Sequence, residues 1–152
     1  MLRRFGRFVG LAIAIIGFFL PMTHAEAAGI MLLPARAGNF KTIIIRTVTA
    51  GEWLVRADFT VTNPERTDLI WCALWGNPRE SGLGDQRWRR LDYDQVWIGL
   101  SLDRLDATIH LEAAIDSLRR FQVKVQCGHN ISGIRPFVEP DATLRIVRNL
   151  NA

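Results

Sequence analysis

Two cysteines, Cys72 and Cys127, have the most readily predicted chemistry in this 152-residue sequence. Each lies in a stretch where apolar residues recur at alternate positions, DLIWCALW at 68–75 and FQVKVQC at 121–127. Successive side chains of a β-strand point to opposite faces, so this alternation turns both thiols toward one core. We therefore predict a structural Cys72–Cys127 disulfide. Closing a loop of this length stabilises a fold by up to about 4 kcal/mol.

The remaining reactive residues form no familiar metal or catalytic pattern. His129 follows Cys127 by two positions, but a disulfide removes that thiol, and His110 is the one further imidazole beyond residue 27. Four aspartates cluster without the spacing of a calcium-binding loop: Asp92, Asp94, Asp103 and Asp106. No Gly-x-Ser-x-Gly motif occurs. We predict no metal, no cofactor and no catalytic residue, and an enzyme is the less favoured class.

Aromatic residues are the strongest candidates for ligand binding: Trp71, Trp75, Trp88, Tyr93 and Trp97. Strand alternation places Trp71, Trp75 and Trp97 on the side opposite to the cysteines. Aromatic rings on such a surface stack on sugar rings or anchor protein partners. Burial against loops or a neighbouring subunit would also explain them, because large exposed apolar patches are uncommon on monomers. The sequence leaves both interpretations open.

The stretches that carry these residues have the period of two expected of β-strands. The clearest is 52–62, where Val55, Ala57 and Phe59 alternate with polar residues. Further strands are predicted at 41–48, 68–75, 94–102, 106–115, 121–127 and 142–147. In 94–102 the inward positions would include Leu100 and Leu102. The sequence therefore predicts an all-β fold, a single-domain antiparallel β-sandwich of seven to nine strands.

The first 27 residues have the composition of a signal peptide. Arg3, Arg4 and Arg7 precede an apolar run at 8–20, and the small residues Ala25 and Ala27 offer cleavage sites. The run is shorter than the roughly 20 residues needed to cross a bilayer, which argues against a permanent membrane anchor. We expect a signal-peptide helix in 1–27, an arm or short first strand in 28–39, and the sandwich in 40–150. The protein would be exported, to the periplasm or outside the cell.

The charge balance after export argues against nucleic acid as a partner. The chain has 19 Lys and Arg against 15 Asp and Glu. Cleavage after Ala27 removes three of the bases and one of the acids, which leaves 16 against 14. The bases are scattered among acids, as on an ordinary solvated surface.

The order of these features resembles small exported bacterial β-sandwiches whose jelly roll is similar to C1q and tumour-necrosis-factor domains. An AGEW turn at 50–53 leads into an alternating strand that ends in TNP at 62–64. A strand with Cys72, a variable loop, two alternating strands and a strand with Cys127 follow, and the last strand carries Leu144 and Ile146. The resemblance covers 40–150 and implies a jelly-roll-like fold without a catalytic signature.

Three functions are compatible with this sequence. The first is a secreted or periplasmic non-enzymatic binding module for an unknown protein or glycan, either as a single chain or as a homo-oligomer. The second is a carbohydrate-binding or weakly glycosidic envelope protein that uses the surface tryptophans and an acid from 85–94. The third is an enzyme inhibitor whose contact lies in the glycine-rich loop at 76–85.

Overall fold

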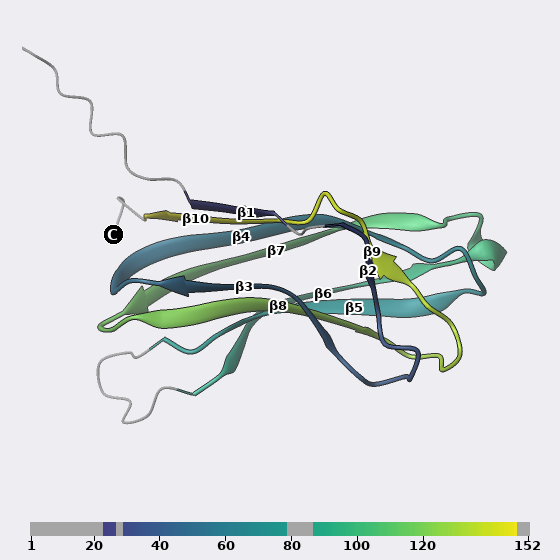
Figure 1. The fold of residues 1–152 in the computed structure, drawn as a ribbon, viewed down its shortest axis with the longest axis horizontal. Helices are drawn as coiled ribbons and strands as arrows, with labels where there is room; N and C mark the ends of the chain where they lie inside the picture. Colours follow the sequence, from purple (N-terminus) through teal and green to yellow (C-terminus); the bar gives the residue numbers. More distant parts are fainter. Residues whose placement is uncertain (1–22, 27–28, 79–86, 149–152) are drawn as a thin grey trace, which may run out of the picture.

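The computed structural model describes residues 23–26, 29–78 and 87–148, which form two antiparallel sheets packed face to face (Figure 1). Sheet A contains β1 (Thr23–Glu26), β2 (Met31–Leu32), β4 (Gly51–Thr62), β7 (Asp106–Ser117), β9 (Phe137–Val138) and β10 (Thr143–Arg148). Sheet B contains β3 (Lys41–Val48), β5 (Asp68–Gly76), β6 (Arg89–Ile98) and β8 (Phe121–His129).

The strand order is that of a jelly roll. Sheet A runs β1-β10-β4-β7. The short strand β9 pairs with β4 beyond the end of β10, and β2 pairs with β9. Sheet B runs β3-β8-β5-β6. The chain repeatedly passes from one sheet to the other, as two interlocked Greek keys require. The predicted antiparallel, jelly-roll-like β-sandwich is confirmed.

The core lies between the sheets and is built from the predicted alternating positions. Each sheet buries one face, as expected when apolar and polar residues alternate along a strand. The largest fully buried side chains come from both sheets and include Phe59, Ile70, Leu74, Ile109, Leu111 and Phe121. Full burial of a side chain of this kind contributes about 1.5–3 kcal/mol, so this shared interior provides much of the stability of the fold.

One predicted strand is too long, because β6 ends at Ile98. Leu100 and Leu102 lie in a 3-10 turn, where they are 60% and 50% exposed, so their predicted inward orientation is wrong. Gly99 explains the break: it has a φ of 145°, and an added Cβ would lie 2.4 Å from the backbone of Thr67. The chain turns here, and the Gly99 N–H donates to the carbonyl of Arg104.

The N-terminal strand β1 falls inside the range predicted as a leader. It pairs with β10, with Thr23 opposite Ile146 and Glu26 opposite Thr143. Cleavage after Ala27 would therefore remove the outermost strand of sheet A. The rest of the predicted signal-peptide helix, at 1–22 and 27, lies outside the described residues. No helix in the described ranges is long and apolar enough to cross a bilayer.

The edge of β7 is covered by carboxylates from the other sheet. Among the described strands, β7 pairs only with β4, and β6 of sheet B packs beside it. Asp92 accepts the backbone N–H of Glu112 at 2.7 Å, and Asp94 accepts that of His110 at 3.4 Å. Two members of the predicted acidic series thus satisfy backbone donors that an edge strand would otherwise expose.

Candidate functional site

The predicted disulfide is present and joins the two central strands of sheet B. Cys72 of β5 lies directly opposite Cys127 of β8, with a Cα–Cα distance of 4.1 Å, and both residues are fully buried. The bond fixes the register of β5 and β8. It therefore also fixes which side chains are neighbours on the outward side of the sheet.

The structure brings all five predicted aromatic residues to the outer face of sheet B. Ile70, Cys72 and Leu74 point into the core, so Trp71 and Trp75 point out of β5. On β6, Tyr93 and Trp97 point the same way, opposite Ala73 and Leu69. Trp88 immediately precedes β6 and contacts Lys124 of β8. We call these five residues, together with Phe40, the aromatic face. Its use in ligand binding remains a prediction.

Phe40 and Gly128 determine how Trp71 lies in this face. Phe40 precedes β3 and meets the Trp71 ring edge-on, with ring centroids 3.9 Å apart and an interplanar angle of 72°. Gly128 lies opposite Trp71, and an added Cβ there would lie 3.1 Å from the indole. The missing side chain lets the indole lie close against β8. Phe40 was not predicted, because it lies outside any alternating stretch.

None of the five predicted aromatic side chains belongs to the buried core. Trp97 is 55% exposed, Tyr93 41% and Trp88 38%. Trp71 and Trp75 are half-buried, and the Trp75 indole N–H has no acceptor among the described residues. Two half-buried rings on β5 are therefore flanked by more exposed rings along β6. Six residues of a strand span about 20 Å, so Leu69 to Trp75 defines an elongated surface.

Amide, hydroxyl and cationic groups lie between the rings. The Tyr93 hydroxyl donates to the side-chain oxygen of Gln95, and Gln126 donates to the Thr42 hydroxyl at 3.1 Å. Lys124 Nζ lies 4.3 Å from the Trp88 ring centroid, and the Arg90 guanidinium lies 5.1 Å from that of Tyr93. Strand alternation could have identified Gln95, Gln126 and Lys124 as outward neighbours of the tryptophans.

A surface hollow of about 420 Å³ adjoins the Trp75 end of this face. It is lined by Thr47, Asn77, Arg120, Phe121 and Gln122. The Asn77 side chain accepts the Gln122 N–H at 2.6 Å, which fixes the start of β8 to the end of β5. Residues 79–86 follow, so most of the predicted inhibitor loop lies outside the described part of the chain.

The outer face of sheet A has a second hollow, of about 370 Å³, with charges of both signs. Its lining residues are Arg56, Asp58, Asp92, His110, Leu111, Glu112 and Arg145. Arg56 pairs with Glu112, and His110 Nδ1 lies 2.7 Å from an Asp58 oxygen. The lining contains no serine, threonine or cysteine hydroxyl or thiol that could act as a nucleophile. These charged groups mainly satisfy one another.

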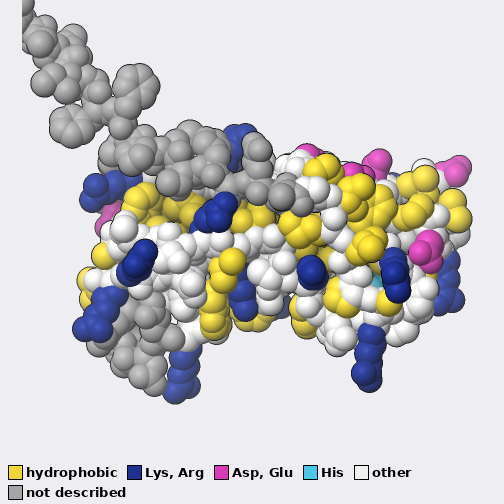
Figure 2. Space-filling view, viewed as in Figure 1, with side chains coloured by type: hydrophobic (Ala, Val, Ile, Leu, Met, Phe, Trp, Pro, Cys, Tyr) yellow, Lys and Arg dark blue, Asp and Glu magenta, His cyan; other side chains and the backbone are white. Residues whose placement is uncertain are grey.

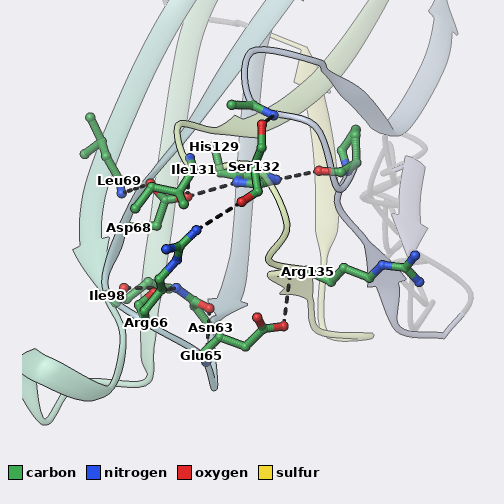
Figure 3. Close-up of polar contacts among 12 residues, drawn as sticks. Asn63, Glu65, Arg66, Asp68, Leu69, Ile98, His129, Ile131, Ser132 and Arg135 are labelled. Carbon is green, nitrogen blue, oxygen red and sulfur yellow. Dashed lines mark hydrogen bonds and ion pairs between the residues drawn. The ribbon is translucent and has the colours of Figure 1, made fainter.

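A buried hydrogen-bonded pair, Asp68–His129, anchors one end of sheet B (Figure 3). Both side chains are fully buried, and His129 Nδ1 lies 2.9 Å from Asp68 Oδ2. His129 Nε2 donates to the Pro34 carbonyl, and the same Asp68 oxygen accepts the Ile131 N–H at 2.9 Å. The pair therefore ties β5 and β8 to the segments at 34 and 131. The sequence pattern does not indicate this pair, because its members are 61 positions apart.

The same contacts occupy the Cys127 and His129 side chains that were considered as a metal pair. Cys127 is bonded to Cys72, and both ring nitrogens of His129 face protein oxygens. Within the described ranges, no three His, Cys, Asp or Glu side chains are grouped so that they could hold a metal ion.

Comparisons with known proteins support the fold alone. No protein-family model and no curated protein matches the sequence. The structure is similar to that of infectious bursal disease virus Gt strain, with a TM-score of 0.60, 10% identity and coverage of 96% of this chain. For the Gx strain the TM-score is 0.59, with 8% identity and 84% coverage. This chain spans 38% and 32% of those chains, about a third of their length.

A third structure is less similar. The CBM22-1 xylan-binding domain from Paenibacillus barcinonensis Xyn10C has a TM-score of 0.43 and 8% identity, over 80% of this chain and 87% of that domain. Identities this low leave the function to be argued from the residues of this chain.

Proposed function

We propose that this protein is an exported, non-enzymatic binding module whose aromatic face holds an extended glycan. The observation that carries the proposal is the gathering of Trp71, Trp75, Trp88, Tyr93 and Trp97 on one outward sheet face. The C–H groups of a sugar ring pack on an indole plane, as apolar surfaces do, and its hydroxyl groups need hydrogen-bonding partners. Gln95, Gln126 and Thr42 supply these partners between the rings.

The shape of the face favours a chain of sugars over a single one. It extends for about 20 Å along β5, and Tyr93 and Trp97 of the neighbouring β6 are 41% and 55% exposed, so several consecutive sugar units can contact it. Export fits the disulfide, because such bonds persist in oxidising compartments. The proposal includes a signal-peptide leader at 1–27 and a jelly roll that specifically resembles C1q and tumour-necrosis-factor domains.

Tryptophan fluorescence provides a direct test. Four of the five tryptophans belong to the aromatic face, whereas Trp53 lies in sheet A, where its indole donates to the Thr49 carbonyl at 3.1 Å. We expect soluble polysaccharides to change this emission. Trp97→Ala should weaken binding about 30-fold, the loss typical of a binding hot spot of about 2 kcal/mol.

The matched control is Leu118→Ala, which removes a side chain that is 61% exposed between β7 and β8. This variant should bind like the wild type. Sedimentation of each protein separates binding from self-association. If Trp97→Ala lowers the oligomeric mass and leaves glycan affinity unchanged, the aromatic face is a subunit interface and the proposal is wrong.

A further inference from the structure

The strands of sheet B place no acidic side chain on the aromatic face. Their described residues include three acids, Asp68, Asp92 and Asp94. Asp68 is fully buried against His129, and the other two point toward β7, where they accept backbone N–H groups. In the edge-on view of Figure 2, most of the visible acids lie in the upper half, toward sheet A, and the charged side chains visible along the lower margin are Lys and Arg.

Cations, in contrast, stand directly on the aromatic rings. Lys124 lies over Trp88, and Arg90 lies over Tyr93. A ring face attracts a cation through its quadrupole and, unlike a carboxylate, does not neutralise its charge. The face therefore keeps a positive potential beside the surfaces on which a sugar would stack.

On the basis of the proposed glycan-binding function, we propose that the aromatic face selects anionic glycans, whose sugars carry carboxylate, sulfate or phosphate groups. A stacked sugar projects its substituents past the ring edge. Lys124 and Arg90 each lie directly opposite Trp75, so a substituent of a sugar on that ring can reach either cation. Charge-assisted hydrogen bonds are about twice as strong as neutral ones, and the described strands of sheet B place no acid on the face that would repel the ligand. A neutral glycan would gain only the stacking and the contacts to the amides.

A matched pair of polymers tests the selection. Polygalacturonate carries a carboxylate on every sugar, and its fully methyl-esterified form has the same backbone without the charge. We expect the protein, produced from the full chain, to bind polygalacturonate at least tenfold more tightly at low salt. Rising salt should remove this difference, because exposed charges are screened. Heparin and a phosphorylated mannan, compared at equal charge, then identify which anionic group is preferred.

Two charge-removing variants locate the selectivity. Lys124→Gln and Arg90→Gln should each weaken binding of polygalacturonate about fivefold more than binding of the ester, as expected for loss of one partly exposed charged contact. The control is Arg145→Gln, which makes the same change on the outer face of sheet A. It should bind both polymers like the wild type.

The outcomes separate this inference from the function on which it rests. If both polymers bind equally and Trp97→Ala weakens both, glycan binding stands and the anionic selection is wrong. If Trp97→Ala weakens neither, the proposed function itself fails. Arg145→Gln losing as much affinity as Lys124→Gln would show a nonspecific charge effect and overturn the selection. Tighter binding of poly-dT than of polygalacturonate would assign the face to single-stranded nucleic acid and also overturn it.

Discussion

The two outer faces of this sandwich belong to one fold and carry different chemistry. On sheet A, outward polar side chains pair across neighbouring strands: Arg56 forms an ion pair with Glu112, and His110 contacts Asp58. On sheet B, the described outward positions hold rings, amides and cations, and its acids face elsewhere. One face is electrostatically self-contained, whereas the other has groups that an external ligand can satisfy.

The two sheets therefore differ in their outward-facing residues, and the proposed function depends on these. The inward halves of both sheets are equally apolar and serve the same core. Net charge hides the contrast, because the acids of sheet A offset the cations of sheet B in any sum over the chain. Only the assignment of residues to faces reveals it.

Removing the disulfide should have the largest effect, and this effect should be centred on sheet B, whose β5 and β8 the bond joins. Replacing both Cys72 and Cys127 with alanine should lower the free energy of unfolding by about 4 kcal/mol, because the unfolded chain regains the entropy of an open loop. Glycan affinity should also fall, since the β5–β8 register holds Trp71 against Gly128. Urea denaturation and glycan titration measure the two effects.

Reduction of the wild type provides the control for this variant. Dithiothreitol should destabilise the wild type and leave the double variant unchanged. A loss of less than 1 kcal/mol in the double variant would show that the bond does not support sheet B as described.

Breaking the buried Asp68–His129 pair should be the next largest change. Asp68→Ala leaves buried hydrogen-bonding groups of His129 and Ile131 without their partner, which costs up to about 3 kcal/mol. Asp68→Asn should cost less, because an amide oxygen still accepts the Ile131 N–H. Chemical denaturation compares the two variants. Equal losses would mean that the hydrogen bonds around Asp68 contribute little.

Removing β1 tests whether the two faces are independent. A chain that begins at Gly29 lacks the ladder to β10, which we expect to cost about 2 kcal/mol, from about four hydrogen bonds worth roughly 0.5 kcal/mol each. Glycan affinity should not change, because β1 belongs to sheet A. The control begins at Met22 and keeps the strand. Identical unfolding midpoints of the two chains would contradict the role assigned to β1.

The smallest effect is expected from the paired charges of sheet A. Glu112→Gln removes the exposed ion pair with Arg56, and pairs of this kind contribute about 0.5 kcal/mol or less. The thermal unfolding midpoint should move by about 2 °C at most, and glycan affinity should stay the same. A marked loss of affinity would show that sheet A takes part in binding and would end the contrast between the faces.

Much of this architecture can be predicted from the sequence, because the alternation of apolar and polar residues along a β-strand shows which side chains face the core. Alternation in 52–62 and 121–127 correctly gave the inward residues, and the same period put Trp71 and Trp97 outside. The prediction was wrong at Leu100, because the apolar alternation continues past Gly99 although the strand ends at Ile98. A close approach between two backbones leaves no trace in hydrophobic periodicity.

Contacts between distant strands could not be predicted in this way. Asp68 and His129 are 61 positions apart, and their meeting depends on the register that places His129 opposite Ile70. Asp92 and Asp94 look like ordinary surface acids, because their backbone partners belong to the other sheet. Phe40 lies outside any strand. The aromatic residues could be selected by residue type alone. The charges around them could be assigned only from the structure, because it shows that Asp92 and Asp94 face β7 of the other sheet.

The carboxylates that cover β7 also bear on how neighbouring molecules can join. Exposed strand edges are templates on which further chains add, and fibrils grow by this route. A strand approaching β7 would first have to displace Asp92 and Asp94, and would then face their negative charge. Growth by strand addition is thereby directed to the opposite side of the sandwich, where β1, β2 and β3 are outermost. Even in a crowded compartment, the β6–β7 side should resist fibril formation.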